Sequence, residues 1–186
     1  MLRVLITGMS GTGKSTLLNR LASHGYKTVD SDSHPSLQRF VPRSSDARQA
    51  SQNDSPESAD SHTTNAADGA DTAGQDGEWM WHEEFQQLLS TEDAEVLFVS
   101  GTVRNQGKFY RQFDHIILLS APVPVIVERL ATRTNNPYGK HPDELADVLT
   151  YVETVEPLLR DGCTLEIDTS VPIEAVVQTV LDTVRR

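Results

Sequence analysis

The chain has 186 residues, a length suited to one domain, and a formal net charge of −11. This acidic balance argues against nucleic acid as a partner, because neutralising phosphates requires clustered Lys and Arg. No apolar run approaches the roughly 18 residues of a membrane span, so we expect no membrane partner. The apolar start, residues 2–6, is too short for a signal peptide, and the single Cys163 forms no intrachain disulfide. Both features favour a cytoplasmic protein.

Residues 44–78 account for the low apolar content of 37%. This stretch contains no Val, Ile, Leu, Met, Phe, Trp, Tyr or Cys, and it holds eight acidic residues against the single basic Arg48. Such a segment buries too little apolar surface to offset the entropy of ordering it. We therefore predict one domain over residues 1–186 that is interrupted by a disordered acidic insertion over 44–78.

Four elements are predicted before the insertion. Residues 2–7 form a continuous apolar run, typical of a buried strand, and residues 14–23 have helical periodicity with Gly25 placed as a left-handed cap. A second strand is predicted over 26–29. Pro35 is suited to the first turn of a short helix over 35–40.

After the insertion, helices and strands alternate. The predicted helices cover 79–90, 108–113, 123–132, 144–159 and 173–184, and the predicted strands cover 96–101, 115–120 and 164–167. Residues 134–142, rich in Asn, Gly and Pro, are predicted to form a loop. Because the strands are continuous apolar runs that alternate with helices, we expect an α/β fold with a five-stranded parallel sheet covered by helices on both faces.

The strongest motif lies between the first strand and the first helix. The sequence GMSGTGKS at 8–15 fits G-x-x-x-x-G-K-[ST], in the strand–loop–helix context that this motif requires. Glycines let successive backbone N–H groups point into one concavity, and the positive end of the next helix favours phosphate there. Lys14 is expected to reach the phosphates, and Ser15 to place its hydroxyl on Mg²⁺. The predicted nucleotide-binding residues are Gly8, Gly11, Thr12, Gly13, Lys14, Ser15 and Thr16.

Two carboxylates follow the second strand, in VDSDS at 29–33. Ligands of open α/β sheets bind at the carboxyl ends of the strands. Asp30 is therefore predicted to help hold Mg²⁺, and Asp32 to orient or deprotonate the hydroxyl of an acceptor. A polar turn before Pro35 is the alternative interpretation.

The end of the third strand, Ser100-Gly101, carries no acidic residue. Gly101 is predicted to leave room for a small substrate, with a plain turn as the alternative. The next residues, TVRNQG, are polar and follow a strand's carboxyl end. Arg104 is therefore predicted to contact the substrate, although a turn that caps a helix explains this stretch equally well.

Arg129 and Arg133 lie four residues apart, so they share a helix face. The loop that follows contains Gly139 and two prolines, and its closure would bring both arginines to the nucleotide. Arginines on a closing lid balance the charge of a transferring phosphoryl group. We therefore predict catalytic roles for both, with an exposed basic face as the alternative.

These motifs together resemble the small phosphate-loop kinases of the shikimate kinase, gluconate kinase and adenylate kinase group. The similarity covers residues 1–40 and 94–186, through GMSGTGKST, VDSDS, LFVSG, IILLSAP...ERLATRTNNP and LEIDTSVPIEAVVQTVL. It implies a three-layer P-loop fold, ATP and Mg²⁺ as cofactors, and a closing lid. The sequence departs from shikimate kinases after the third strand, where one glycine replaces a glycine run.

The resulting hypothesis is an ATP-dependent phosphotransferase that acts on a small hydroxylated or phosphorylated metabolite. Lys14, Asp32, Arg129 and Arg133 are the predicted catalytic residues. The alternative is a nucleotide-binding regulator or slow hydrolase without an acceptor. A nucleic-acid end kinase is a weaker alternative because the chain has no obvious basic surface. The sequence does not predict an oligomeric state.

Overall fold

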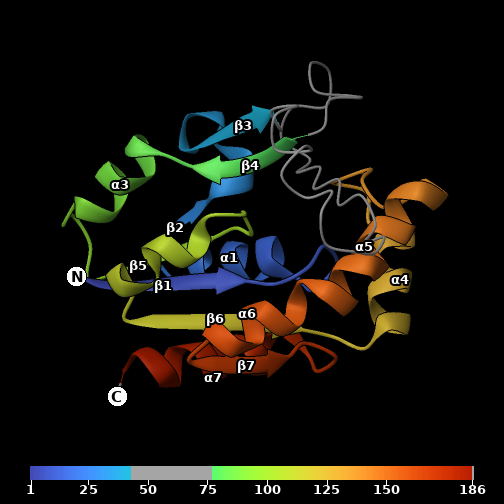
Figure 1. Cartoon of the computed structure of the whole chain (residues 1–186). Coiled ribbons are helices and arrows are strands. Elements are labelled where there is room, and N and C mark those ends of the chain that lie inside the picture. The colour runs from blue at the N-terminus through green and yellow to red at the C-terminus, as the bar shows by residue number, and fades with distance from the viewer. Residues whose placement is uncertain (43–76, 186) are drawn as a thin grey trace.

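The computed structural model describes residues 1–42 and 77–185, and its centre is a parallel sheet. The five strands lie in the order β2-β5-β1-β6-β7, with β1 in the centre (Figure 1). Their bounds are Leu2–Thr7 for β1, Lys27–Asp30 for β2, Val96–Ser100 for β5, His115–Ser120 for β6 and Leu165–Asp168 for β7. The predicted five-stranded parallel sheet is confirmed.

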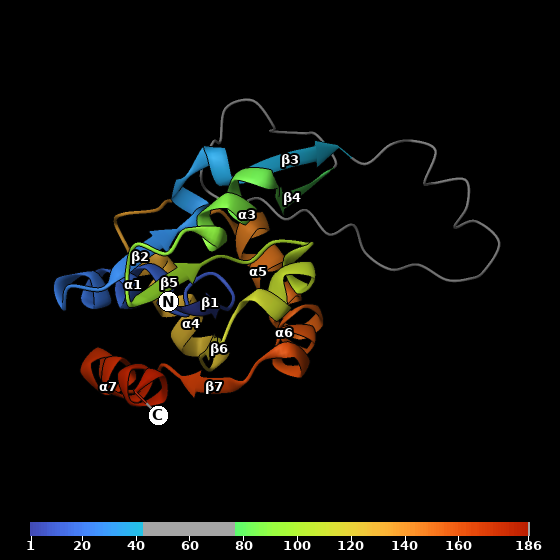
Figure 2. The same cartoon turned by 90° about the vertical axis from the view of Figure 1, so that its left-hand side faces the viewer.

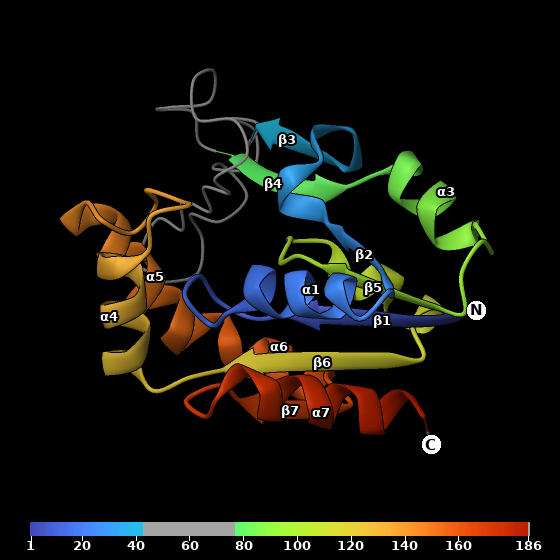
Figure 3. The same cartoon turned by 180° about the vertical axis from the view of Figure 1, so that it is seen from behind.

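Helices cover both faces of this sheet. Helices α1 (Lys14–Ser23) and α7 (Ile173–Val184) pack side by side on one face (Figure 3). The opposite face is covered by α3 (Glu83–Ser90), the 3₁₀ helix η3 (Gln106–Gln112) and α6 (Glu156–Gly162). Helices α4 (Val123–Thr132) and α5 (Pro142–Thr154) lie beyond the carboxyl ends of the strands (Figure 1).

The alternation of side chains along β1 connects the two core layers. Val4 and Ile6 pack with α1 and α7, whereas Leu5 belongs to the layer around Phe85 and Leu97 on the other face. Successive side chains of a strand point to opposite faces, so one apolar run supplies both layers. Within the described residues, no helix is long and apolar enough to cross a membrane.

A second, two-stranded sheet replaces the predicted helix over 35–40. Only Pro35–Leu37 forms a 3₁₀ turn, and Gln38–Pro42 forms strand β3, antiparallel to β4 (Gly77–Trp81) (Figure 2). The prediction was wrong because the partner of β3 lies 34 residues further along the chain, where local periodicity gives no sign of it. This pair lies above β2 and β5 in Figure 1.

The segment that follows the insertion was predicted as one helix but forms a strand and then a helix. The predicted helix over 79–90 is a strand up to Trp81, and α3 begins only at Glu83. Gly77 and Glu78, assigned to the insertion, belong to β4, where Gly77 lies against the ring of Phe40. The rest of the predicted insertion lies outside the described residues.

The predicted long helix over 144–159 is two helices. Helix α5 ends at Thr154 and α6 begins at Glu156, with Pro157 in the first turn of α6. Proline has no backbone N–H and its ring clashes with the carbonyl four residues earlier, so it breaks a continuous helix at this point. The apolar spacing continues across the break, which is why the pattern did not reveal it.

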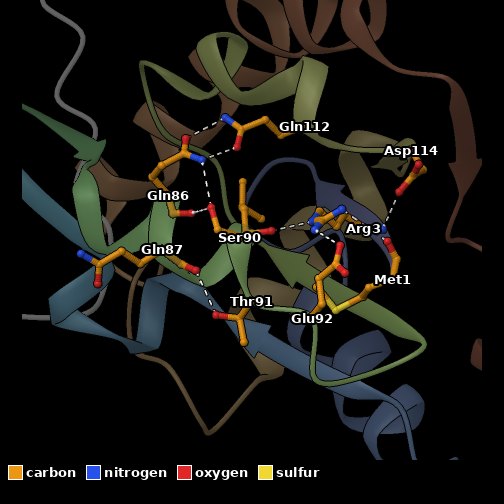
Figure 4. A network of polar contacts seen from close by, with 10 residues as sticks. Met1, Arg3, Gln86, Gln87, Ser90, Thr91, Glu92, Gln112 and Asp114 are labelled. Carbon is orange, nitrogen blue, oxygen red and sulfur yellow. Dashed lines mark hydrogen bonds and ion pairs between the residues drawn. The ribbon is translucent and has the colours of Figure 1, made fainter.

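Arg3 joins the amino-terminal edge of the sheet to α3 (Figure 4). Its Nε donates to the carbonyl oxygen of Leu89 at 2.6 Å, its Nη2 lies 3.3 Å from Glu92, and its backbone N–H donates to Asp114 at 2.7 Å. Nearby, the side-chain amides of Gln86 and Gln112 exchange two hydrogen bonds. This network lies at the opposite end of the strands from the phosphate loop.

We predict that Phe85→Ala destabilises the protein strongly. The Phe85 ring is fully buried and stacks on Trp81 with centroids 3.9 Å apart. Its removal leaves a cavity and should cost about 3–5 kcal/mol of unfolding free energy in urea titrations. Leu158→Ala, at a side chain that is 63% exposed, is the control and should change it by less than about 0.5 kcal/mol. Equal effects of the two substitutions would contradict the assigned core.

Candidate functional site

The loop between β1 and α1 has the conformation that its glycines predict. Gly8, Gly11 and Gly13 have φ values of 144°, 87° and 97°. A Cβ on Gly8 would lie 2.3 Å from the carbonyl oxygen of Leu119, on the neighbouring strand β6. No side chain fits there, so the chain passes directly over β6 before it turns into α1. The turn leaves the backbone of residues 8–13 free to form an anion-binding concavity.

Hydroxyl groups from two other strand ends hold this loop. Thr102, after β5, donates to the carbonyl of Gly8 at 3.0 Å, and Thr169, after β7, lies 2.9 Å from the carbonyl of Thr12. Inside the loop, Thr12 donates to the carbonyl of Met9 at 2.8 Å. The loop is therefore fixed from both sides of β1. Neither Thr102 nor Thr169 was predicted.

Lys14 lies at the mouth of this concavity. Its Nζ donates to the carbonyl oxygens of Gly8 at 2.6 Å and Met9 at 3.3 Å. Burial lowers the pKa of Lys14, while the charges of Asp32 and Asp30 oppose that shift. The ammonium group is thus turned into the loop and faces both carboxylates.

Asp30 joins three elements at the carboxyl edge of the sheet. Ser15, in α1, donates to its Oδ2 at 2.8 Å, and Ser100, at the end of β5, donates to its Oδ1 at 3.0 Å. The parallel register pairs Asp30 directly with Ser100. A hydroxyl beside a carboxylate fits Mg²⁺, which binds oxygen. Residues 1–42 and 77–185 contain no cluster of three or more His, Cys, Asp or Glu side chains for a metal, so phosphates and waters would complete the coordination.

Asp32 lies opposite Lys14, in the 3₁₀ turn η1 (Ser31–Ser33). Its Oδ1 accepts a hydrogen bond from the buried Gln38 at 2.9 Å. Burial raises the pKa of Asp32, and nearby Asp30 adds to this, whereas Lys14 and the bond from Gln38 lower it. The carboxyl group is therefore closer to a proton-accepting range than an ordinary Asp.

The two predicted arginines have different surroundings. Arg129 donates to Thr169 Oγ1 at 2.9 Å and to the Thr169 carbonyl at 2.6 Å, with a weaker contact to Gly11 at 3.4 Å. Arg133 donates to the carbonyl of Tyr138 at 2.5 Å, and its buried Nε has no hydrogen-bond partner among residues 1–42 and 77–185. The charge of Arg133 also contributes to lowering the pKa of Lys14, so it acts on the phosphate end of the site.

A cavity of about 420 Å³ brings most of these residues together. The phosphate loop and α1 form its floor, the two aspartates form one side, and α4 with the following loop forms the other. The predicted residues in its lining are Gly11, Thr12, Gly13, Lys14, Ser15, Thr16, Asp30, Asp32, Arg129 and Arg133. Gly8 is not part of this lining, and its backbone packs against the Leu119 carbonyl.

Gly101 and Arg104 lie outside this lining. The space above Gly101 is filled, because a Cβ there would lie 2.2 Å from Ser31 Oγ and 3.0 Å from the Trp81 ring. The exposed Arg104 forms an ion pair with Glu78 of β4 at 3.5 Å. The segment after β5 therefore packs against the β3–β4 pair.

Residues 4–150 match the sequence model of a family described as an AAA domain. The chain belongs to this AAA domain family. No curated protein matches its sequence. The matched range contains the phosphate loop, both aspartates and both arginines of the site.

Solved structures similar to this AAA domain include small-molecule kinases. A shikimate kinase from Acinetobacter baumannii in complex with shikimate has a TM-score of 0.61 and 17% identity, over 99% of this chain and 93% of that one. A shikimate kinase from Bacteroides thetaiotaomicron has a TM-score of 0.61 and 16% identity, over 100% and 99%. A gluconokinase from Sinorhizobium meliloti 1021 has 0.53 and 19%, over 95% and 87%. The P-loop fold predicted from the motifs is thereby confirmed.

Gly8→Ala should impair both the loop and nucleotide binding. The added methyl group meets the Leu119 carbonyl, and the positive φ adds strain of about 1–3 kcal/mol. We expect the displaced loop to lose at least about 1.4 kcal/mol of ATP-binding free energy, which corresponds to at least about tenfold weaker binding in calorimetric titrations. Gly107→Ala is the control, because a Cβ there has nothing within 4 Å. Unchanged ATP affinity in Gly8→Ala would contradict the assigned binding site.

Asp32→Asn should stabilise the protein at pH 8. Because the pKa of Asp32 is raised in the folded chain, its contribution to stability is fully present below the ordinary pKa and is lost as pH rises through the raised one. An uncharged Asn avoids that loss, so the melting temperature should rise at pH 8 and change little at pH 4.

Asp93→Asn is the control for Asp32→Asn, because the pKa of Asp93 is lowered whereas that of Asp32 is raised. The hydrogen bond from Lys27 lowers the pKa of Asp93, so neutralising that carboxylate should not stabilise the protein at pH 8. A melting temperature of Asp32→Asn at pH 8 that is equal to or below that of the unmodified chain would contradict the assigned environment of Asp32.

Proposed function

We propose that this protein is an ATP-dependent phosphotransferase whose acceptor is a small hydroxylated or phosphorylated metabolite. The observation that carries the proposal is the position of Lys14. Its ammonium group bonds to the carbonyls of the phosphate loop, the charges of Asp30 and Asp32 act on its pKa, and all three residues line one cavity. A site for a phosphorylated donor thus borders groups suited to proton transfer.

The donor side is formed by the phosphate loop. Backbone amides of residues 11–16 at the start of α1 are suited to bind the phosphates of ATP. Arg129, fixed by Thr169, would lie at the far end of these phosphates, next to the apolar lining from Val171, Ile173 and Val176. This apolar wall suits the base of a nucleotide.

Ser15 and Asp30 would hold Mg²⁺, as their contact at 2.8 Å supports. When bound, Mg²⁺ supplies positive charge that neutralises the phosphate oxygens and orients them. Ser100 keeps the Asp30 carboxylate in place by its hydrogen bond to Oδ1. The other carboxylate oxygen of Asp30, Oδ2, thus stays beside the Ser15 hydroxyl of α1.

Asp32 would act on the acceptor. The hydroxyl oxygen of the acceptor forms a bond to the γ-phosphorus, the bond from that phosphorus to the bridging oxygen of ADP breaks, and the hydroxyl proton passes to Asp32. Lys14 and Arg133 would stabilise the negative charge of the transferring group. Gly101 has no direct place in this scheme, and Arg104 would contact the acceptor only if its ion pair with Glu78 opens.

Two observations support a small-molecule acceptor. Similar folds occur in a shikimate kinase bound to shikimate and in a gluconokinase. The net charge of −11 disfavours nucleic acid, and the proposed reaction suits a cytoplasmic location, where ATP is available.

Lys14→Ala should lower turnover by at least about 10²–10³-fold while the fold is kept. Removing a single hydrogen-bond donor that stabilises transition-state charge typically costs about that much in kcat. ADP formation from ATP–Mg²⁺ measures the rate, and thermal melting reports the fold. Arg20→Ala is the matched control, because Arg20 lies on the same helix but pairs with Glu174 on the surface. An unchanged rate in Lys14→Ala would exclude this mechanism.

A further inference from the structure

We propose that Gln38 is a positioning residue for Asp32, and that the β3–β4 pair sets the orientation of this carboxylate through buried hydrogen bonds centred on Ser31. The inference rests on the proposed function, because it assigns Asp32 to the acceptor side. It extends that function by giving the second, antiparallel sheet a role in the reaction.

Gln38 forms the direct link to Asp32. It is the first residue of β3, its side chain is only 5% exposed, and its Nε2 lies 2.9 Å from Asp32 Oδ1 and 3.1 Å from Ser31 Oγ. Among the residues that the structure describes, Asp32 Oδ2 accepts no hydrogen bond. The bond from Gln38 therefore holds one oxygen of the carboxylate and leaves the other for an acceptor.

Trp81 fixes the other side of this arrangement. Its indole Nε1 donates to the same Ser31 Oγ at 3.0 Å, and its ring stacks on Phe85 in the core. Gln38 and Trp81 are directly paired across the β3–β4 register, so the two donors to Ser31 come from neighbouring positions of one small sheet. The network joins the two strands to the turn that carries Asp32.

Gly101 is required by this network. Ser31 Oγ and the Trp81 ring occupy the space that any larger side chain at 101 would need. Glycine at position 101, directly after β5, thus leaves room for the hydrogen bond from Trp81 Nε1 to Ser31 Oγ.

Asn105 attaches the β3–β4 pair to the phosphate loop. Its side chain accepts from the Trp81 backbone N–H at 2.9 Å and donates to the Trp81 carbonyl at 2.8 Å. Thr102, three residues earlier, holds the carbonyl of Gly8. One short segment therefore fixes both the donor-binding loop and the strand whose indole supports the Asp32 turn.

A positioning role predicts a specific kinetic pattern for Gln38→Met, a substitution of similar size without the amide. With ATP–Mg²⁺ and water as the acceptor, kcat should fall at least about tenfold, because small misplacements of a catalytic group are costly. The KM for ATP should stay within about twofold, as the donor side is intact. Trp81→Phe keeps an aromatic ring beside Phe85 but removes the indole N–H donor, so it should also lower kcat.

The Asp32→Asn background separates positioning from a general structural effect. If Gln38 acts through Asp32, Gln38→Met should slow the Asp32→Asn protein by less than about twofold. Gln86→Met is the matched control, since Gln86 forms an exposed amide pair with Gln112 far from the site (Figure 4). An unchanged kcat in Gln38→Met, or an equal loss in both backgrounds, would overturn the proposal.

The proposed function can fail separately from this inference. If the unmodified chain shows no turnover with water, shikimate, gluconate, nucleosides or nucleoside monophosphates, the phosphotransferase assignment fails. Crystal structures of the unmodified and Gln38→Met proteins then test the positioning itself. We expect the Asp32 carboxylate to rotate in the variant, and an unchanged carboxylate would overturn the role of Gln38.

Discussion

The close approach of the Gly8 backbone to β6 is the constraint on which the rest of the site depends. A Cβ at position 8 would lie only 2.3 Å from the Leu119 carbonyl oxygen, so only glycine fits at this point. Gly8 also has a positive φ, a conformation that other residues avoid. That exit directs the loop over the carboxyl edge of the sheet and starts α1 there. Lys14, Ser15 and the amides of the first turn reach the cavity because of this turn.

The other strands contribute to the site through their ends. β2 supplies Asp30, β5 supplies Ser100 and then Thr102, and β7 supplies Thr169, which contacts both the loop and Arg129. Because all five strands are parallel, their carboxyl ends meet at one edge, and short hydroxyl and carboxylate side chains there are close enough to bond. The proposed donor side is accordingly held by several short contacts at the carboxyl ends of the central strands.

The proposed acceptor side would depend on the β3–β4 pair. Trp81 of this pair bonds to Ser31 and Asn105, which lie in the segments that follow β2 and β5. The similarity to shikimate kinases and a gluconokinase extends over almost the whole chain at 16–19% identity, so it shows the fold alone.

Signals that are contiguous in the sequence predicted the sheet and the conformation of the loop between β1 and α1. GMSGTGKS, the apolar strands and the positions of Asp30 and Asp32 each needed only a local pattern. Contacts between distant segments could not be found in this way. The pairing of Asp30 with Ser100 depends on strand register, and the pairing of Gln38 with Trp81 joins residues 43 positions apart. The apolar periodicity of 144–159 concealed the break at Pro157. Gly101 was predicted to leave room for a substrate, but Ser31 and Trp81 fill the space beside it.

The most direct test of the account is ADP formation from ATP–Mg²⁺ with and without shikimate, gluconate, nucleosides and nucleoside monophosphates. The account predicts that at least one of these acceptors raises the rate well above that with water, and that the acceptor gains the phosphoryl group. A uniformly slow rate with tight ATP binding, and no phosphorylated product from any acceptor, would contradict it and favour a nucleotide-binding regulator.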